Sequence, residues 1–369
     1  MNYDLAIIGG GMVGAALACA LQDSPLKIIL IDAAASHAND HRLIALNHTS
    51  CEFFKNLTIW PELAAHAARI DEVHISNRGH FGRTRLTAQE LSRTYLGCVV
   101  PAKEINLALY AQLEKLKNVT LLRGAKVIAL TEDSITIQHA HEQQTVHATI
   151  VAAADGTFST VRELLHIPTD IVDYQQKALV TITELTRSHH HVAYERFLAN
   201  AVIAMLPLIG SRVATIWSGE QTAIDELVNL PEEDFLQLLQ KQFGYRLGKF
   251  QKIQERFTYP LKYVKAKQQT QGRFILLGNA AHTLHPIAAQ GLNLALYEVA
   301  LLAKHLSQKL SLENLPDFFT QEKVSSNLSH QLTKIFSWDF FGAQAARQWG
   351  MIGLDLCGAI KRWLGEKIV

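Results

Sequence analysis

The chain begins with two short apolar runs separated by a glycine-rich stretch and an alanine-rich stretch. Residues 3–8 (YDLAII) are rich in isoleucine and leucine, which is typical of a buried parallel strand. Residues 12–21 indicate a helix, and residues 27–31 (KIILI) indicate a second strand that ends at Asp32. This order of strand, glycine turn, helix and strand predicts a βαβ unit.

The rest of the chain divides into a strand-rich middle and a helical end. Residues 178–219 contain four strand-like runs, whereas the pattern from Gly291 onward is almost wholly helical. No repeat, low-complexity tract or long linker separates these regions. We therefore interpret the middle as an insertion between halves of one nucleotide-binding domain, in an α/β (α+β) fold. Further helices are expected over residues 104–117 and 231–243, and further strands over residues 119–122, 126–130, 134–138, 146–154 and 274–277.

A GxGxxG motif, residues 9–14 (GGGMVG), lies between the first strand and the first helix. Gly9 allows a tight turn, Gly11 lets the backbone approach a pyrophosphate, and Gly14 lets the helix pack on the sheet. The helix amino terminus supplies N–H groups and partial positive charge for the phosphates. Asp32 closes the second strand, where an acid accepts hydrogen bonds from ribose hydroxyls. The motif predicts dinucleotide binding and leaves FAD and NAD both open.

Two further stretches follow apolar strands. Residues 154–162 (ADGTFSTVR) indicate a turn with Ser159 as a helix N-cap, and alone they predict nothing more. Residues 278–293 (GNAAHTLHPIAAQGLN) precede a long helix, so they offer backbone N–H groups to an electron-rich ligand. His282 and His285 lie in this stretch, but no cysteine or carboxylate with metal-ligand spacing is nearby, and we predict no metal site.

The three motifs, in this order and at these distances, resemble those of the flavin-dependent aromatic hydroxylases, the para-hydroxybenzoate-hydroxylase-like monooxygenases. Residues 276–299 (LLGNAAHTLHPIAAQGLNLALYEV) are similar to the signature of the ubiquinone-biosynthesis hydroxylases in that family. The resemblance covers nearly the whole chain and is most specific in the third motif. It also includes residues 42–46, 195–197, 206–208 and 217–218 and the helical tail.

The resemblance implies an FAD-binding Rossmann-like βαβ domain with an inserted mixed β-sheet substrate domain and a helical carboxyl-terminal region. The expected ranges are 1–70, 98–172 and 270–330 for the FAD-binding domain, 71–97 and 173–269 for the substrate domain, and 331–369 for the helical region.

The resemblance also implies that FAD is the bound cofactor and that NAD(P)H is a transient reductant. Gly9, Gly11 and Gly14 would lie under the FAD pyrophosphate, with Asp32 on the adenosine ribose. Arg42 would contact the flavin side of the ribityl-phosphate. The implied cofactor-binding residues are Gly9, Gly11, Met12, Val13, Gly14, Asp32, Arg42, Val127, Asp155, Gly156, Asn279, Gln290, Gly291, Leu292 and Asn293.

The other implied roles concern adenine, the reductant and the flavin ring. The backbone of Val127 would lie near adenine, and Asp155 and Gly156 would contact both FAD and the transient NAD(P)H. Asn279 stands where most relatives have aspartate, at the ribityl chain. For catalysis the resemblance implies only an environment for the flavin ring, formed by Pro286, His285 and Gln290.

Some residues depart from the family signature. Ala289 and Ala295 stand where it has glycine, and Glu298 stands where it has aspartate. Ala289 would lie closest to the flavin, so its methyl group would narrow the ring pocket. These departures keep a weakly active scaffold subunit of a quinone-biosynthesis complex open as an alternative. Another flavoprotein oxidoreductase of the same fold, an epoxidase or a reductase, is the second alternative.

The implied reaction is hydroxylation of a polyprenylated phenol in ubiquinone biosynthesis, with NAD(P)H and O₂ as cosubstrates and a flavin C4a-hydroperoxide as oxygen donor. His282 and His285 are candidates for contact with the phenol or for structural roles. The middle sheet would cover the substrate, and its large side chains fit either a pocket or an ordinary core. The pocket candidates are Tyr194, Phe197, Met205, Pro207 and Trp217.

Composition narrows the class of protein. Of 369 residues 48% are apolar, which excludes intrinsic disorder. The 35 basic and 34 acidic residues give a net charge of +1, which argues against a nucleic-acid partner. Only 19% of residues are charged, but the uncharged runs over 5–22 and 274–297 contain glycines or too many polar groups for membrane spans. Four scattered cysteines fit reduced thiols in the cytoplasm.

The last helical stretch, residues 336–369, combines tryptophan and phenylalanine with Lys361 and Arg362. That composition fits an interfacial membrane contact, and it fits equally a helix packed on the core or on a partner. A polyprenyl substrate favours a membrane surface or a quinone-biosynthesis complex. We therefore expect a cytoplasmic protein, with a peripheral site on the inner membrane as an open alternative.

Overall fold

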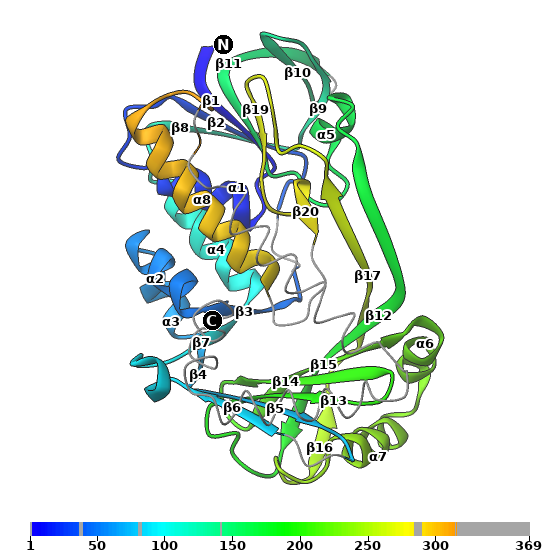
Figure 1. The fold of residues 1–369 in the computed structure, drawn as a ribbon. Helices are drawn as coiled ribbons and strands as arrows, with labels where there is room; N and C mark the ends of the chain where they lie inside the picture. Colours follow the sequence, from blue (N-terminus) through cyan, green and yellow to red (C-terminus); the bar gives the residue numbers. More distant parts are fainter. Residues whose placement is uncertain are drawn as a thin grey trace.

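The structure is a computed structural model, which describes residues 2–36, 40–79, 83–140, 142–283, 290–313 and 315. In this described part, the chain forms three sheets with helices packed against them (Figure 1). Helices and mixed sheets in this arrangement confirm the α/β fold class.

The first sheet contains eight described strands, including those of the βαβ unit. Its path runs β18-β19-β11-β1-β2-β8, while β10 pairs with β11 and β9 pairs with β10. β1 pairs in parallel with both β11 and β2. The strands are β1 (Asn2–Ile8), β2 (Ile28–Asp32), β8 (Val119–Arg123), β9 (Ala125–Leu130), β10 (Ser134–His139), β11 (Glu142–Ala153), β18 (Thr270–Gln271) and β19 (Phe274–Leu276).

Both faces of this sheet are covered, which explains why its central strands are apolar throughout. Leu5 and Ile7 of β1 share a core with α1, α4 and α8, whereas Ala6 and Ile8 share a core with β9, β10 and α5. The helices are α1 (Met12–Ala20), α4 (Ala102–Leu113), α5 (Thr160–Leu164) and α8 (Gln290–Gln308).

The second sheet contains nine described strands, along the path β20-β17-β12-β15-β14-β13-β5-β6, with β16 paired to β12. Helices α6 and α7 pack on one of its faces. The elements are β5 (Glu72–Asn77), β6 (Arg83–Thr87), β12 (Thr169–Leu185), β13 (Val192–Phe197), β14 (Ala201–Leu208), β15 (Arg212–Glu220), α6 (Gln221–Asn229), α7 (Glu232–Phe243), β16 (Phe250–Ile253), β17 (Phe257–Ala266) and β20 (His282–Thr283).

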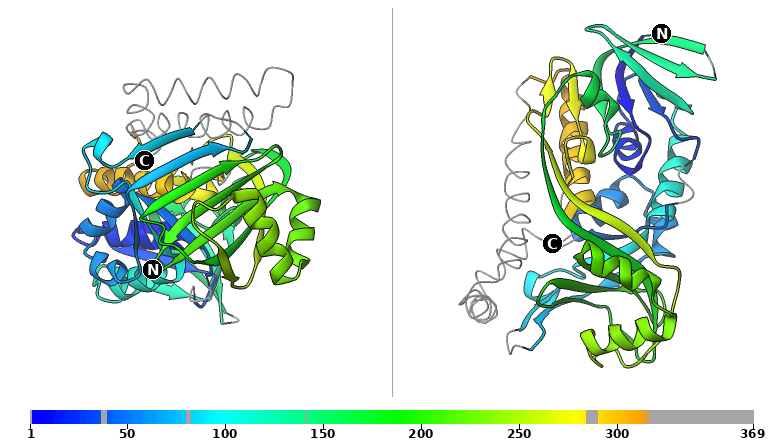
Figure 2. Two further views of the ribbon diagram at one scale, coloured as in Figure 1. Left: turned by 90° about the horizontal axis from the view of Figure 1, so that it is seen from below. Right: turned by 90° about the vertical axis from the view of Figure 1, so that its right-hand side faces the viewer.

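Two long antiparallel strands, β12 and β17, connect the first sheet to the second. They run side by side along one edge of the molecule, and Figure 2 shows them as curved green and yellow-green ribbons. The expected boundary after residue 172 falls inside β12, so the proposed domain limits stay a prediction.

A small third sheet, in the order β3-β7-β4, lies between the two larger ones (Figure 1). It packs against the second sheet through an apolar cluster that includes Ile70, Val99 and Leu208. The elements of this region are β3 (Leu43–Asn47), α2 (His48–Asn56), α3 (Trp60–Ala64), β4 (Ala68–Ile70), η1 (Gln89–Leu91) and β7 (Gly97–Pro101).

The strands and helices expected between residues 3 and 277 are confirmed, with shifts of a few residues at their ends. Ser159 caps α5 as predicted, because its hydroxyl accepts a hydrogen bond from Arg162 N–H. The sequence pattern missed the third sheet, the helices α2, α3 and α6, and the strands β5, β6, β16 and β17. The expected helical tail over residues 336–369 lies outside the described residues.

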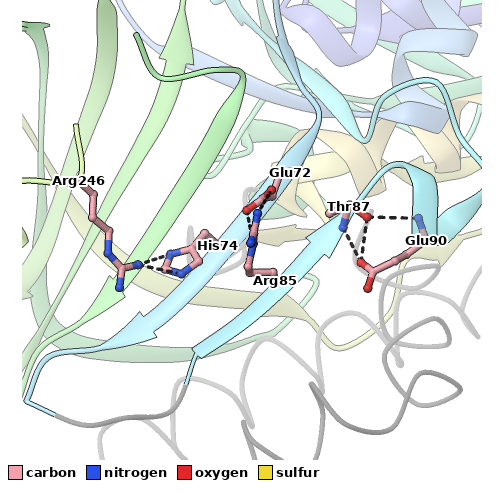
Figure 3. A network of polar contacts seen from close by, with 6 residues as sticks. All are labelled: Glu72, His74, Arg85, Thr87, Glu90 and Arg246. Atoms are coloured by element: carbon pink, nitrogen blue, oxygen red, sulfur yellow. Dashed lines mark hydrogen bonds and ion pairs between the residues drawn. The ribbon is translucent and has the colours of Figure 1, made fainter. Parts of the chain in front are cut away.

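A polar network ties the β5–β6 hairpin to the loop after α7 (Figure 3). Arg85 of β6 makes two hydrogen bonds to the Glu72 carboxylate, at 2.7 and 2.6 Å. Arg246 Nη1 lies 2.8 Å from Nε2 and 2.9 Å from Nδ1 of His74, which is buried. Burial and the Arg246 guanidinium lower the pKa of His74 to about 4. His74 is therefore neutral in the folded protein at neutral pH.

We expect the protein to lose stability between about pH 7.5 and about pH 5, because His74 binds a proton in the unfolded chain but not in the folded one. Since the folded pKa is the lower of the two, the loss begins near the ordinary histidine value. It amounts to about 2 kcal/mol at about pH 5. Urea unfolding at both pH values measures it. His74→Gln, which does not titrate, should show the smaller decrease, and equal decreases in the two proteins would contradict the assignment.

Candidate cofactor site

The three sequence motifs meet at one edge of the first sheet, where the parallel strands β1, β11 and β19 end. β11 pairs in parallel with both β1 and β19. Beyond the strands, Ala154 N–H donates to Ile8 O at 2.7 Å, and Leu277 N–H donates to Ala153 O at 2.8 Å. The motifs therefore leave the sheet side by side, at the edge where open α/β sheets bind their ligands.

The glycines of the first motif have two different surroundings. Gly9 has a left-handed φ of +102°, and a Cβ there would lie 2.4 Å from Ala154 O. A Cβ on Gly14 would lie 1.9 Å from Gly9 O, whereas a Cβ on Gly11 would meet no described protein atom within 4 Å. Gly9 and Gly14 thus let the turn pack tightly. Gly11 borders open space at the amino terminus of α1, which no described side chain caps.

Asp32 ends β2 and is buried beside the glycine turn. Its Oδ1 accepts a hydrogen bond from Ala34 N–H at 3.2 Å, and its Oδ2 lies 3.1 Å from the hydroxyl of Tyr110. The same hydroxyl lies 2.8 Å from Gly10 O. Burial and the Asp32 carboxylate raise the pKa of Tyr110, so the hydroxyl keeps its proton at neutral pH. The sequence analysis missed Tyr110, because nothing in the pattern of α4 sets it apart from its neighbours.

The second motif is a turn that is bonded to the third. Gly156 has a φ of +84°, and a Cβ there would meet no described atom within 4 Å. Asp155 Oδ2 accepts a hydrogen bond from a backbone N–H of α5 at 3.1 Å, and burial raises the pKa of Asp155. Arg162 donates to Thr157 O at 2.7 Å and to Ala280 O at 2.8 Å. The Arg162 guanidinium therefore joins the two motifs.

The third motif begins in the turn η2 (Gly278–Ala280) and ends in the first turn of α8. Asn293 of α8 donates from Nδ2 to Ala45 O at 2.9 Å and accepts at Oδ1 from Asn47 N–H at 2.9 Å. This amide fastens α8 to the junction between β3 and α2. His282 is buried, and its Nε2 lies 2.7 Å from Glu298 Oε1.

The other predicted residues of the third motif lie near its beginning and its end. Asn279 is exposed, Leu292 packs partly against the core, and Gly291 borders open space. Gln290 begins α8, but its side chain lies outside the described residues. His285 and Pro286, together with Ala289, also lie outside them, so their place at the flavin ring stays a prediction.

Of the remaining candidates, Arg42 lies near the second sheet. Its backbone N–H and its Nε contact Asp40 Oδ1 at 3.1 and 2.9 Å, and this carboxylate raises the pKa of Arg42. Tyr259 of β17 is close enough to contribute to the same shift. Val127 lies in β9 within the core, opposite Ile137 of β10. Met12 and Val13 are the first two residues of α1.

The pocket candidates divide between the two faces of the second sheet. Tyr194, Met205 and Trp217 pack in a core with α6 and α7, where Tyr194 meets Phe243 edge to face. Pro207 lies two residues after Met205 and shares its face, whereas Phe197 lies on the opposite face from Tyr194. The structure thus brings most of these candidates into ordinary core beneath the helices. The opposite face carries Ile182, Leu206 and Ile216.

These features fit FAD. The open space beside Gly11, at the amino end of α1, suits a pyrophosphate, because backbone N–H groups and the helix dipole favour anions there. Asp32 suits ribose hydroxyls, and a Cβ on Gly156 or on Gly291 would meet no described atom within 4 Å. A parallel sheet with these three turns at its carboxyl edge, joined to a second mixed sheet, defines the fold class of FAD-dependent monooxygenases. The chain belongs to the family described as the FAD binding domain, whose model matches residues 2–319.

Comparison with known proteins is consistent with membership of this family. The chain is 30% identical to ubiquinone hydroxylase UbiL of Rhodospirillum rubrum, over 97% of this chain and 87% of that protein. It is 29% identical to 3-demethoxyubiquinol 3-hydroxylase of Escherichia coli, over 81% of this chain and 78% of that protein. Among solved structures, p-nitrophenol 4-monooxygenase PnpA from Pseudomonas putida has the same fold, with a TM-score of 0.80 at 17% identity, covering 100% of this chain and 98% of that chain. The family resemblance predicted from the motifs is confirmed.

Neither a metal cluster nor a membrane-spanning helix occurs among the described residues. In that part of the chain, no group of three or more histidine, cysteine, aspartate or glutamate side chains is arranged to hold a metal ion. Likewise, none of the described helices combines the length and the apolar character needed to cross a bilayer.

Gly11→Ala and Gly14→Ala should affect two different properties, although each adds one methyl group. At Gly11 the methyl enters open space, so we expect unchanged stability without cofactor and an FAD dissociation constant raised at least about tenfold. At Gly14 the methyl overlaps Gly9 O, so we expect the cofactor-free protein to lose about 2 kcal/mol or more. Thermal unfolding and flavin fluorescence titration measure the two effects. Unchanged FAD binding by Gly11→Ala would contradict the pyrophosphate assignment.

Proposed function

We propose that this protein hydroxylates the ring of a polyprenylated phenol in ubiquinone biosynthesis, with NAD(P)H as reductant and O₂ as oxygen source. The supporting observation is that three motifs meet at one sheet edge, in a chain that resembles ubiquinone hydroxylase UbiL over 97% of its length. FAD supplies the electron transfer and oxygen activation that side chains lack. The residues of the chain bind and orient FAD and exclude water from it.

We assign the FAD pyrophosphate to the space beside Gly11 and the adenosine ribose to Asp32. Tyr110 supports this role, because its hydroxyl lies 3.1 Å from one carboxylate oxygen of Asp32 and helps to orient the group. We assign the turn at Gly156 to FAD and to the transient NAD(P)H. Residues 290–293 begin α8, where partial positive charge stabilises negative charge on a reduced flavin.

We assign the substrate ring to the face of the second sheet that α6 and α7 leave uncovered. On this face Val180, Ile216 and Ala204 stand directly opposite one another across β12, β15 and β14. All three are only half-buried, and Phe257 of β17 continues the row. The ring of Phe257 stacks on His41 at 5.2 Å. Half-buried apolar side chains in a row suit an aromatic ring that carries a long hydrocarbon chain.

The substrate class can be narrowed further. Within the ubiquinone hydroxylases, the Asn279 form of the third motif most resembles that of 2-octaprenyl-6-methoxyphenol hydroxylase. We therefore propose a polyprenylated methoxyphenol as the substrate. The relative from Rhodospirillum rubrum is itself named a ubiquinone hydroxylase, which is consistent with this class.

Purified, FAD-loaded protein should convert a prenylated methoxyphenol to a product with one added hydroxyl group. With isotopically labelled O₂, mass spectrometry should find one labelled oxygen atom in the product and NAD(P)H oxidation that depends on the phenol. Val180→Asp should raise the KM for the phenol by about tenfold, because a carboxylate opposes the apolar ring and chain. Val172→Asp, at an exposed position of the same strand, is the control. NAD(P)H oxidation that no phenol accelerates would contradict the proposal.

We also propose that the enzyme works in the cytoplasm at the surface of the inner membrane. Each methylene of the prenyl chain favours lipid by about 0.8 kcal/mol, so the substrate stays in the bilayer. The protein should therefore float with vesicles of bacterial polar lipids that contain the phenol. Protein that stays in the aqueous layer would contradict this proposal and favour a quinone-biosynthesis complex that presents the substrate.

A further inference from the structure

Glu298 is a buried carboxylate of α8 at the base of the third motif. Only 1% of the residue is exposed. Its Oε1 lies 2.7 Å from His282 Nε2 and accepts a hydrogen bond from Gln269 Nε2 at 3.1 Å. Its Oε2 accepts a hydrogen bond from Gly278 N–H at 3.2 Å. Glu298 therefore joins α8 to Gln269, just before β18, and to two residues at the start of the third motif.

Glu298 offers a hydrogen-bond acceptor on each of its two oxygens. The Gly278 amide donates to Oε2, and the Gln269 side-chain amide donates to Oε1, which also lies beside His282 Nε2. A glutamine at this position would present one oxygen and one NH₂ group. Its NH₂ group would face either Gly278 N–H or the Gln269 NH₂ group, so one of these two donors would always lose its acceptor. An aspartate would keep both acceptors on a shorter stem.

Gly278 is the point at which the first and third motifs touch. It has a left-handed φ of +53°, and a Cβ there would lie 3.1 Å from Val13 Cγ2 and 3.2 Å from Ala295 Cβ. Val13 belongs to α1 and Ala295 to α8, so the Gly278 backbone is held between these two helices. The hydrogen bond from Gly278 to Glu298 fixes this backbone from the side of α8.

We propose that Glu298 is a positioning residue for FAD. By holding Gly278 between α1 and α8, its carboxylate sets the distance between the first motif, which we assign to the pyrophosphate, and the third, which we assign to the flavin. Glu298 acts through Gly278 and His282 rather than by touching the cofactor. A fully satisfied buried polar network favours one arrangement of the segments it joins. The proposal rests on FAD binding by this chain.

Glu298→Gln and Glu298→Asp test the proposal, with Glu313→Gln, an exposed change just after α8, as the control. We expect Glu298→Gln to raise the FAD dissociation constant by about 10-fold to 100-fold, as loss of a buried hydrogen bond implies. The visible absorption and circular dichroism bands of the bound flavin should also change. Glu298→Asp should have a smaller effect in the same direction, and the control none.

A merely structural role for Glu298 would give a different result. Thermal unfolding of the cofactor-free protein would show a loss of stability, while the folded variants would bind FAD with wild-type affinity and spectrum. That result would overturn the proposal. If Glu298→Gln does not fold, the stability, FAD affinity and flavin spectrum of Glu298→Asp are compared with those of the wild type instead. Failure of the proposed function is distinguishable, because wild-type protein would then bind FAD but leave the phenol unchanged.

Discussion

Three parallel strands that end at one level of a sheet set the position of the rest of the site. β1, β11 and β19 are joined side by side, so the turns at Gly9, Ala154 and Leu277 leave the sheet together. Segments far apart in the sequence are thereby placed within reach of one ligand. The contact of Gly14 with Gly9 then brings the amino terminus of α1 to the same place. Without that contact, the pyrophosphate that we assign to the space beside Gly11 would not meet a helix terminus.

Polar side chains hold the second and third motifs and α8 in place. The space that we assign to FAD is bordered mainly by backbone. Arg162 joins the second motif to the third, Asn293 joins α8 to the third sheet, and Glu298 joins α8 to Gly278. Most of their partners are backbone groups that are partly or fully buried, and such groups cost free energy when left unpaired. The low charge content of 19% therefore has a structural reason. Each of the two long uncharged runs contains a turn at the carboxyl edge of the first sheet, where glycine surface and backbone N–H groups suit a ligand better than charged side chains do.

Features that act within a few residues could be predicted from the sequence. The apolar run over residues 3–8 marks a strand buried on both faces, and Gly9 and Gly14 mark a turn that excludes side chains. Partners supplied by tertiary contact could not be predicted. Tyr110 belongs to a helix with an ordinary pattern, and Glu298 was noted only as a departure from the family signature, without the contacts that it makes. It also could not be predicted which face of the second sheet the helices cover. Alternation alone does not tell which face α6 and α7 will cover, and Tyr194 lies on the covered one.

The central claim is that FAD binds where the three motifs meet, and amide hydrogen exchange tests it most directly. Comparison of cofactor-free and FAD-loaded protein should show slower exchange over residues 9–14, 155–157 and 278–283 together. Exchange in α7, on the far side of the second sheet, should stay unchanged. Protection confined to one motif, or centred on α7, would contradict the account.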